Sequence, residues 1–182
     1  MTLDAIEIVR RHAEQVFRCD ADSVHGPHHW RTVEKTGLLI APEAGADIET
    51  VQLFTALHDC CRVDDGSDLE HGPRAARMVR DLADSLIRVD PLRFETLTFA
   101  IRHHTDGMTS DDPTIGTCWD ADRLDLGRVG IIPSPTMMST KAGKQIAELG
   151  SVHLYMDQKR PDNRVGRSTR ETQPNTQDGA GG

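Results

Sequence analysis

The chain has 182 residues, 37% of them hydrophobic, so it is long enough to form one globular domain with an apolar core. Its 21 basic and 29 acidic residues give a formal net charge of −8, which argues against general electrostatic binding to a nucleic-acid polymer or an anionic membrane. The four cysteines form no CxxC pattern, the N-terminus lacks the apolar core of a signal peptide, and no segment approaches the roughly 20 apolar residues of a membrane span. We therefore expect a cytoplasmic protein with no membrane segment.

Apolar residues recur at helical spacing along most of the chain, whereas the alternation typical of β-strands is scarce. Start signals precede several of these stretches, among them Asp47, the pair Asp90 and Pro91, and Pro113. In chain order, the pattern predicts helices over residues 6–17, 28–40, 47–59, 68–83, 90–104 and 113–127. The predicted fold is all-α, a single helical bundle of about six or seven helices.

The composition changes at Ser151. Residues 151–182 are rich in Gly, Gln, Asn, Thr and charged residues, and they contain little to bury after Tyr155 and Met156. We expect one domain over residues 1–150 and a flexible polar tail over residues 151–182.

Ionisable side chains fall on the apolar faces of the predicted helices. His58 lies in line with Val51 and Phe54, and the next residue, Asp59, can reach the same point if the helix ends there. The same test points further side chains inward from other helices: His29, His71, His103, His104 and Asp122. Asp120 and Arg123 fall to one side of the last of these helices.

Taken singly, an inward histidine is more often hydrogen-bonded to the backbone than bound to a metal. Five helices repeat the pattern, however, and the buried carboxylates of Asp59 and Asp122 need a compensating cation or donor. A shared divalent metal supplies that charge. Imidazole nitrogen and carboxylate oxygen suit Mn, Fe, Co, Ni, Mg or Zn, and we expect one or two ions.

The ordered set His29, His58, Asp59 and Asp122 resembles the H…HD…D signature of the HD-domain superfamily of metal-dependent phosphohydrolases. The segments "SVHGPHHWRTV", "ALHDCC" and "WDADRLDLG" carry this likeness, which covers roughly residues 5 to 147. "EHGPRAARMV" and "AIRHHTDG" are similar to the family segments that supply additional histidines. Two departures are Thr32, where the family commonly has arginine, and "HHTDGMTSDDP", which lacks the Gly-Tyr-Pro of the branch that cleaves cyclic dinucleotides.

The resemblance implies that His29, His58, Asp59 and Asp122 hold one metal ion. It makes His71, His103 and His104 candidates for a second ion. Alternatively, His71 and His104 are catalytic groups that orient water and protonate the leaving oxygen.

The activity implied is hydrolysis of a phosphate ester by metal-activated water, with Arg62 and Arg123 as candidates for binding the phosphate. For Arg123 the alternative is a surface ion pair with Asp120 or Asp125. Acidic residues in two connections, Asp64, Asp65, Asp111 and Asp112, are expected to make the entrance acidic. A small nucleotide or another small phosphorylated metabolite is therefore the expected substrate, rather than a nucleic-acid polymer, and the chain can form a homo-oligomer. The alternative hypothesis is a non-catalytic HD module that binds metal or nucleotide as a sensor or scaffold.

Overall fold

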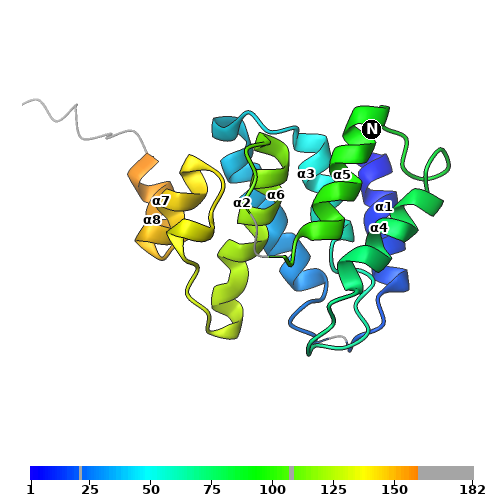
Figure 1. Ribbon diagram of the computed structural model, residues 1–182, viewed down its shortest axis with the longest axis horizontal. Coiled ribbons are helices and arrows are strands. Elements are labelled where there is room, and N and C mark those ends of the chain that lie inside the picture. The colour runs from blue at the N-terminus through cyan, green and yellow to red at the C-terminus, as the bar shows by residue number, and fades with distance from the viewer. Residues whose placement is uncertain (21, 107–108, 160–182) are drawn as a thin grey trace, which may run out of the picture.

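The structure is a computed structural model that describes residues 1–20, 22–106 and 109–159. Within these ranges the regular elements are helices, which confirms the predicted all-α class, with eight α-helices rather than six or seven (Figure 1). The α-helices are α1 (Leu3–Val16), α2 (Pro27–Ala44), α3 (Ile48–Leu57), α4 (His71–Asp81), α5 (Pro91–His103), α6 (Pro113–Leu124), α7 (Lys141–Leu149) and α8 (Val152–Lys159). Two 3-10 helices, η1 (Asp125–Val129) and η2 (Pro135–Met137), lie between α6 and α7. No helix in the described ranges has the length and apolar content needed to cross a bilayer.

Side-chain caps set the starts of three helices. The carboxylates of Asp47, Asp90 and Asp112 accept hydrogen bonds from backbone N–H groups in the first turns of α3, α5 and α6. Proline occupies the start of α5 and of α6, where its missing N–H costs no helical hydrogen bond. The residues that predicted these three helix starts from the sequence, Asp47, Asp90 with Pro91, and Pro113, therefore lie at the starts seen in the structure.

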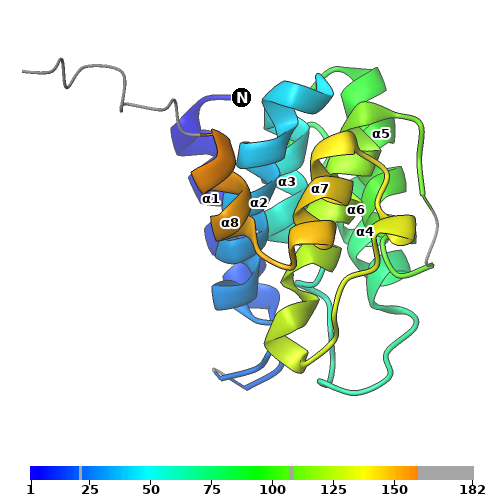
Figure 2. The same cartoon turned by 90° about the vertical axis from the view of Figure 1, so that its left-hand side faces the viewer.

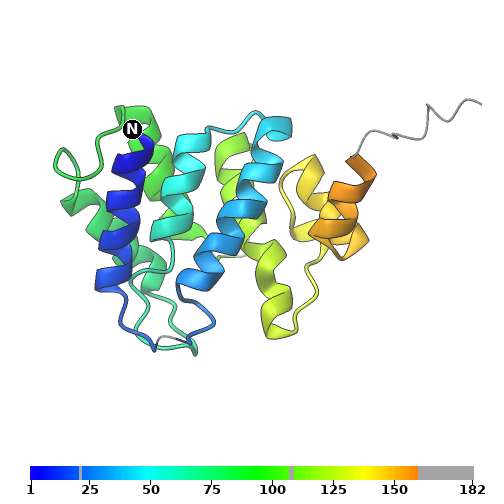
Figure 3. The ribbon, with the colours of Figure 1, turned by 180° about the vertical axis from the view of Figure 1, so that it is seen from behind.

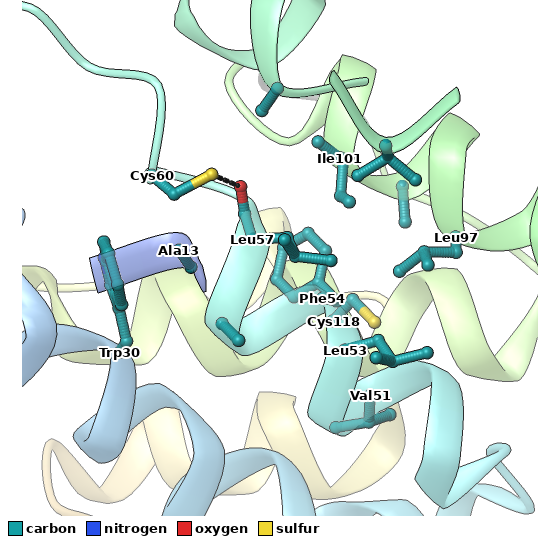
Figure 4. Close-up of a cluster of buried hydrophobic side chains, with 14 of the residues drawn as sticks. Ala13, Trp30, Val51, Leu53, Phe54, Leu57, Cys60, Leu97, Ile101 and Cys118 are labelled. Carbon is teal, nitrogen blue, oxygen red and sulfur yellow. Dashed lines mark hydrogen bonds between the residues drawn. The ribbon is translucent and has the colours of Figure 1, made fainter. Parts of the chain in front are cut away.

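Helix α3 is the centre of the bundle. It lies between α1 and α2 in one layer (Figure 3), and α5 and α6 cover its other side. Figure 4 shows the resulting core, in which Phe54 and Leu57 of α3 meet Leu97 and Ile101 of α5. Helices α2 and α3 approach closely at Gly37, where a Cβ atom would lie only 2.8 Å from a methyl group of Val51. This central packing holds the end of α3 in place, and the end of α3 leads into the site.

A smaller apolar cluster joins α7 and α8 to α2, through Ile40, Ala142, Ile146 and Tyr155. The Tyr155 hydroxyl donates a hydrogen bond of 2.9 Å to the Glu43 carboxylate, and α8 packs beside α2 in Figure 2. The expectation of a flexible tail beginning at Ser151 is therefore wrong for Val152–Lys159, because Tyr155 provides enough apolar surface to anchor a helix. The remainder of the predicted tail, residues 160–182, lies outside the described residues.

Candidate metal centre

The candidate site lies where five helices begin or end at the same end of the bundle. His29 is in the first turn of α2, and His71 is the first residue of α4. The other donors lie at C-terminal ends: His58 and Asp59 follow α3, His104 follows α5, and Asp122 is in the last turn of α6. Helices α2 and α4 start at this end of the bundle, and α3, α5 and α6 finish there, so residues far apart in the sequence meet at one place (Figure 1).

Four donor atoms form a first cluster. The Nε2 atoms of His29 and His58 lie 3.2 Å apart, and they lie 3.2 and 3.6 Å from Oδ1 of Asp122. Both Nε2 atoms also lie 3.7 Å from Oδ2 of Asp59. Ligand distances of about 2.1 Å at angles of roughly 90–110° place neighbouring donors about 3.0–3.4 Å apart, so this set fits around one divalent ion with slight contraction.

Hydrogen bonds orient the imidazoles of His29 and His58. His29 Nδ1 is 2.7 Å from Oδ2 of Asp125, and His58 Nδ1 donates to the carbonyl oxygens of Phe54 and Thr55 at 3.3 and 3.2 Å. In the neutral ring, a proton on Nδ1 leaves a lone pair on Nε2. Two lone pairs and two carboxylates therefore converge on one buried point, and this arrangement requires a cation or bound protons.

A second cluster lies on the other side of Asp59. His71 Nδ1 and His104 Nδ1 are bonded to the carbonyl oxygens of Asp68 and Ile101, so their Nε2 atoms point toward each other at 2.9 Å. These Nε2 atoms lie 3.1 and 3.4 Å from Oδ1 of Asp59. The two carboxylate oxygens of Asp59 thus face different clusters, and either cluster can hold a divalent ion.

The aspartates of the site are held ionised. Burial opposes the charged form of Asp59, but His58, His104, His25 and His71 outweigh this effect and hold its pKa well below the usual range. The pKa of Asp122 is also well below its usual range, because His29 and His58 outweigh the effect of burial. Both groups are therefore anionic at neutral pH and available to a metal.

Burial disfavours the protonated form of His29, yet the hydrogen bonds that its ring donates to the carboxylates of Asp122 and Asp125 overcome this effect and raise its pKa to about 9. Without a metal, a proton on this imidazole supplies part of the positive charge that the carboxylates require. A divalent ion and this proton compete for the same lone pair, so metal binding releases protons.

The structure brings together most of the residues predicted from sequence. His103 is an exception, because it is turned away by one helical step: its Nδ1 pairs with exposed Asp106 at 2.8 Å, and its ring packs on Phe99. Its assignment to a second metal is therefore wrong. The predicted acidic entrance is also wrong: Asp64 bonds to the Gly66 N–H and Asp112 caps α6, and none of the four acidic residues lies among the described residues that line the main cavity.

Three residues of the site were missed by the sequence analysis: His25, Asp125 and Arg128. His25 Nδ1 lies 3.1 Å from Oδ2 of Asp59 and 3.3 Å from Nη2 of Arg128. His25 precedes the first turn of α2, and Arg128 lies in a 3-10 helix, so a test based on α-helical faces could not place them. Asp125 follows Asp122 by three residues, and this spacing was the available signal.

A cavity of about 460 Å³ opens above the metal donors. Asp59, His104 and Asp122 line it, together with His25 and three arginines: Arg62, Arg123 and Arg128. Most of its apolar lining comes from the segment between residues 126 and 138. The volume is that of a typical small-molecule site, so a ligand can reach the candidate metal centre directly.

Arg62 and Arg123 both line this cavity as predicted, but they differ in their partners. Arg62 Nε pairs with Oδ1 of Asp59 at 3.2 Å, and its Nη1 donates to the Gly66 carbonyl at 3.3 Å. Arg123 is only 7% exposed, which excludes a surface ion pair, and its Nη1 donates to the Met137 carbonyl at 2.8 Å. Its Nη2 is buried with no hydrogen-bond partner among the described residues, while the guanidinium lies 5.6 Å from the centre of the Trp119 ring.

Comparisons with known proteins agree with this arrangement. The chain matches the family model of the HD domain over residues 28–142, which is more than half of its length. It is similar in structure to a predicted HD superfamily hydrolase from an uncultured Thermotogales bacterium, with a TM-score of 0.63 and 22% identity over 86% of this chain and 87% of that one. It is also similar to a protein from Lactobacillus plantarum, with a TM-score of 0.59 and 18% identity over 87% of this chain and 96% of that one.

At these identities the two solved structures support the fold alone, and no curated protein matches the chain by sequence. The family assignment depends instead on the matched segment, which contains His29, His58, Asp59 and Asp122, the four residues of the first cluster. The chain therefore belongs to the HD domain family, as its H…HD…D motif predicted.

Proposed function

We propose that this protein is a metal-dependent hydrolase of phosphate esters that acts on a small phosphorylated substrate. One observation carries the proposal: buried imidazole and carboxylate donors converge beside a cavity that Asp59, His104 and Asp122 line together with Arg123. The donors suit a divalent cation, and the arginine suits an anionic ligand. A phosphate ester has the charge to engage both at once.

His29, His58, Asp59 and Asp122 would hold the first ion, and Asp59, His71 and His104 would hold a second. A divalent cation, when bound, lowers the pKa of a coordinated water and offsets negative charge on phosphoryl oxygens. Asp125 orients His29, while backbone carbonyls orient the other three imidazoles. These partners hold the ligand set in place before a substrate arrives.

In the proposed reaction, the oxygen of water forms a bond to phosphorus, the ester P–O bond breaks, and the alcohol departs with a proton. His104 lines the cavity, whereas His71 is not among the described residues that line it. His104 is therefore the better placed of the two to act on the leaving oxygen, and His71 is better placed as a ligand or as a partner that orients His104. Arg123 is the better candidate for the phosphate, because Arg62 is already paired with the Asp59 carboxylate, whereas Arg123 donates to the backbone carbonyl of Met137.

The test combines metal analysis with hydrolysis assays. Protein purified without chelator is analysed for transition metals, and after loading with Mn²⁺, Fe²⁺, Co²⁺ or Mg²⁺ it is assayed on nucleoside monophosphates and simple phosphomonoesters and diesters. We expect release of phosphate or alcohol that Asp122→Ala abolishes, whereas Asp111→Ala, at an exposed aspartate outside the cavity, leaves it unchanged. Metal and nucleotide binding without product from any ester would instead support the sensor hypothesis.

A further inference from the structure

Much of the cavity lining is apolar, and we call these apolar residues the apolar wall. It consists of Leu126, Ile131, Ile132, Pro133, Met137 and Met138. These residues belong to η1, η2, the connection between them and the residue after η2, the yellow-green and yellow segment below and beside α7 in Figure 2. Three of the metal donors, Asp59, His104 and Asp122, line the same cavity, so a molecule that fills it contacts both these donors and the apolar wall.

The apolar wall is tied to the bundle by polar contacts at several points. The buried carboxylate of Asp120 accepts hydrogen bonds of 2.7 Å from the backbone N–H groups of Ser139 and Thr140. Arg123 donates to the Met137 carbonyl at 2.8 Å, and Arg128 donates to the Val24 carbonyl at 2.8 Å. These contacts hold both ends of the segment, so the apolar wall is a preformed surface rather than a loose loop.

Part of the apolar wall is uncovered in this chain. Ile131 is 53% exposed and Ile132 is 84% exposed, while Met138 is buried. Isolated exposed apolar residues are common on protein surfaces, but these residues line one cavity together. An apolar group of a ligand would remove this surface from water at a favourable free energy.

The charges around the cavity limit the polar part of the ligand. Of its three arginines, Arg62 is paired with Asp59, and Arg128 donates to the carbonyls of Val24 and Asp125. Arg128 also pairs with the Asp125 carboxylate at 3.6 Å. Arg123 has no such carboxylate partner among the described residues, and no lysine is among those that line the cavity. This arrangement suits one phosphate group, held between the metal donors and Arg123, and offers little to the additional phosphates of a polyphosphate.

The apolar wall also lacks partners for a hydroxylated ligand. Ser134 and Thr105 are the neutral polar residues at the cavity, and the Ser134 hydroxyl is already bonded to that of Thr136 at 2.8 Å. A sugar placed against the apolar wall would lose hydrogen bonds to water without regaining them.

We propose that the apolar wall selects substrates in which a single phosphate group carries an apolar alkyl or aryl group. This inference rests on the proposed phosphate ester hydrolysis and names its substrate class: phosphomonoesters of apolar alcohols, in preference to sugar phosphates and nucleoside polyphosphates. Ile131 is the residue whose side chain we assign to this selection, because it is half exposed and lies on the cavity.

The experiment measures binding and turnover separately on the Mn²⁺-loaded protein. Dissociation constants of ethyl-, butyl- and hexylphosphonate, which cannot be hydrolysed, are determined by calorimetry, and kcat/KM is determined for the matching alkyl phosphates. The leaving groups in this series have nearly equal pKa values, so chain length changes mainly the apolar contact. Ile131→Ala is compared with Ile8→Ala, a change at an isoleucine of the same 53% exposure on α1.

We expect roughly twofold tighter binding for each added methylene, because a fully buried methylene gives about fourfold and the apolar wall covers one side of the chain. Hexylphosphonate should then bind roughly tenfold or more tightly than ethylphosphonate. Ile131→Ala should reduce this gain to about threefold or less, whereas Ile8→Ala should retain it. Glycerol phosphate and ATP should compete weakly with both proteins.

Equal binding of all three phosphonates, no binding of any of them, or an undiminished gain in Ile131→Ala would overturn the inference. The proposed function fails in a different way: phosphonates then bind with the expected dependence on chain length, and no ester is hydrolysed. Circular dichroism of Ile131→Ala shows whether the fold is retained, and Ile131→Leu, which keeps the apolar surface, should restore the gain.

Discussion

The two histidine clusters share Asp59 but differ in charge. The first contains His29 and His58 with carboxylate oxygens from two residues, Asp59 and Asp122. The second contains His71 and His104 with only the other oxygen of Asp59, and the Arg62 guanidinium already pairs with that oxygen at 3.2 Å. Because the attraction for a dication grows with anionic ligands and falls with a nearby cation, the first cluster should bind metal more tightly.

The largest effect is expected from Asp59→Asn, because this residue contributes to both clusters. An amide removes the shared negative charge and offers one oxygen instead of two. Metal content by elemental analysis should fall below about one tenth of an ion per chain. Hydrolysis should fall by more than the roughly 100-fold that loss of an orienting partner causes. Asp111→Asn is the control, and an Asp59→Asn protein that retains its metal would contradict the shared-ligand interpretation.

The difference between the clusters can be measured directly by titrating Mn²⁺ into metal-free protein. We expect a tight phase from the first cluster and a weaker phase from the second. Asp122→Asn should weaken the tight phase by about 10- to 100-fold or more, while His71→Ala should remove only the weak phase. A single phase in the wild-type protein, unchanged by His71→Ala, would mean that Arg62 occupies the place of a second ion.

The two clusters also differ from the rest of the site in how well the sequence predicts their residues. The ligands of both clusters lie in regular helices or within two residues of a helix end, so apolar stripes predicted the inward direction of His29, His58, His71, His104 and Asp122. The apolar spacing predicted that both His103 and His104 face inward. Because α5 ends at His103, one residue of helical rotation decides which of the two rings faces the site. Arg128 and Asp125 lie in a 3-10 helix, and the role of Asp120 depends on backbone N–H groups some 20 residues away, which no local pattern specifies.

The fold was more accessible to sequence analysis than the cavity. Capping aspartates and helical spacing mark elements that form locally, as at Asp47 and Asp112. The predicted acidic entrance concerned residues in the connections between helices. Side chains there form hydrogen bonds with nearby backbone groups instead of facing the site, as Asp64 does with the Gly66 N–H. Likewise, the apolar wall lies in the segment that follows α6, and no local sequence pattern predicts that this segment folds back beside the metal donors.

The metal-free protein should lose stability in alkaline solution because of the first cluster. The pKa of His29 is raised from 6.5 to about 9, so its contribution is complete below pH 6.5 and is lost as pH rises through 9. A shift of this size corresponds to about 3 kcal/mol in the free energy of unfolding. Asp59 and Asp122 act in the opposite sense, since their lowered pKa values give stability that is present above the ordinary value of 3.8 and is lost as pH falls through the lower folded-state values.

Urea unfolding of chelator-treated protein between pH 6 and 10 checks this expectation. His29→Gln should flatten the alkaline decline, whereas His28→Gln, at the adjacent residue, should leave it in place. Saturating Mn²⁺ should also flatten it, because the metal replaces the proton on His29. A decline of equal size in His29→Gln would assign the effect to other groups.

The smallest effect is expected from Asp125→Asn, which alters the partner of a ligand rather than a ligand. The Asp125 carboxylate lies 2.7 Å from Nδ1 of His29, so it orients the ring and makes Nε2 a better donor. An asparagine keeps an oxygen that can accept this hydrogen bond but loses the charge, and we expect about tenfold weaker Mn²⁺ binding in the tight phase with the weak phase unchanged. The chain supplies a matched control in Asp106, whose carboxylate lies 2.8 Å from Nδ1 of His103 in the same kind of pair outside both clusters. If Asp106→Asn weakens metal binding as much as Asp125→Asn does, the effect comes from general loss of negative charge, and Asp125 has no specific role in orienting His29.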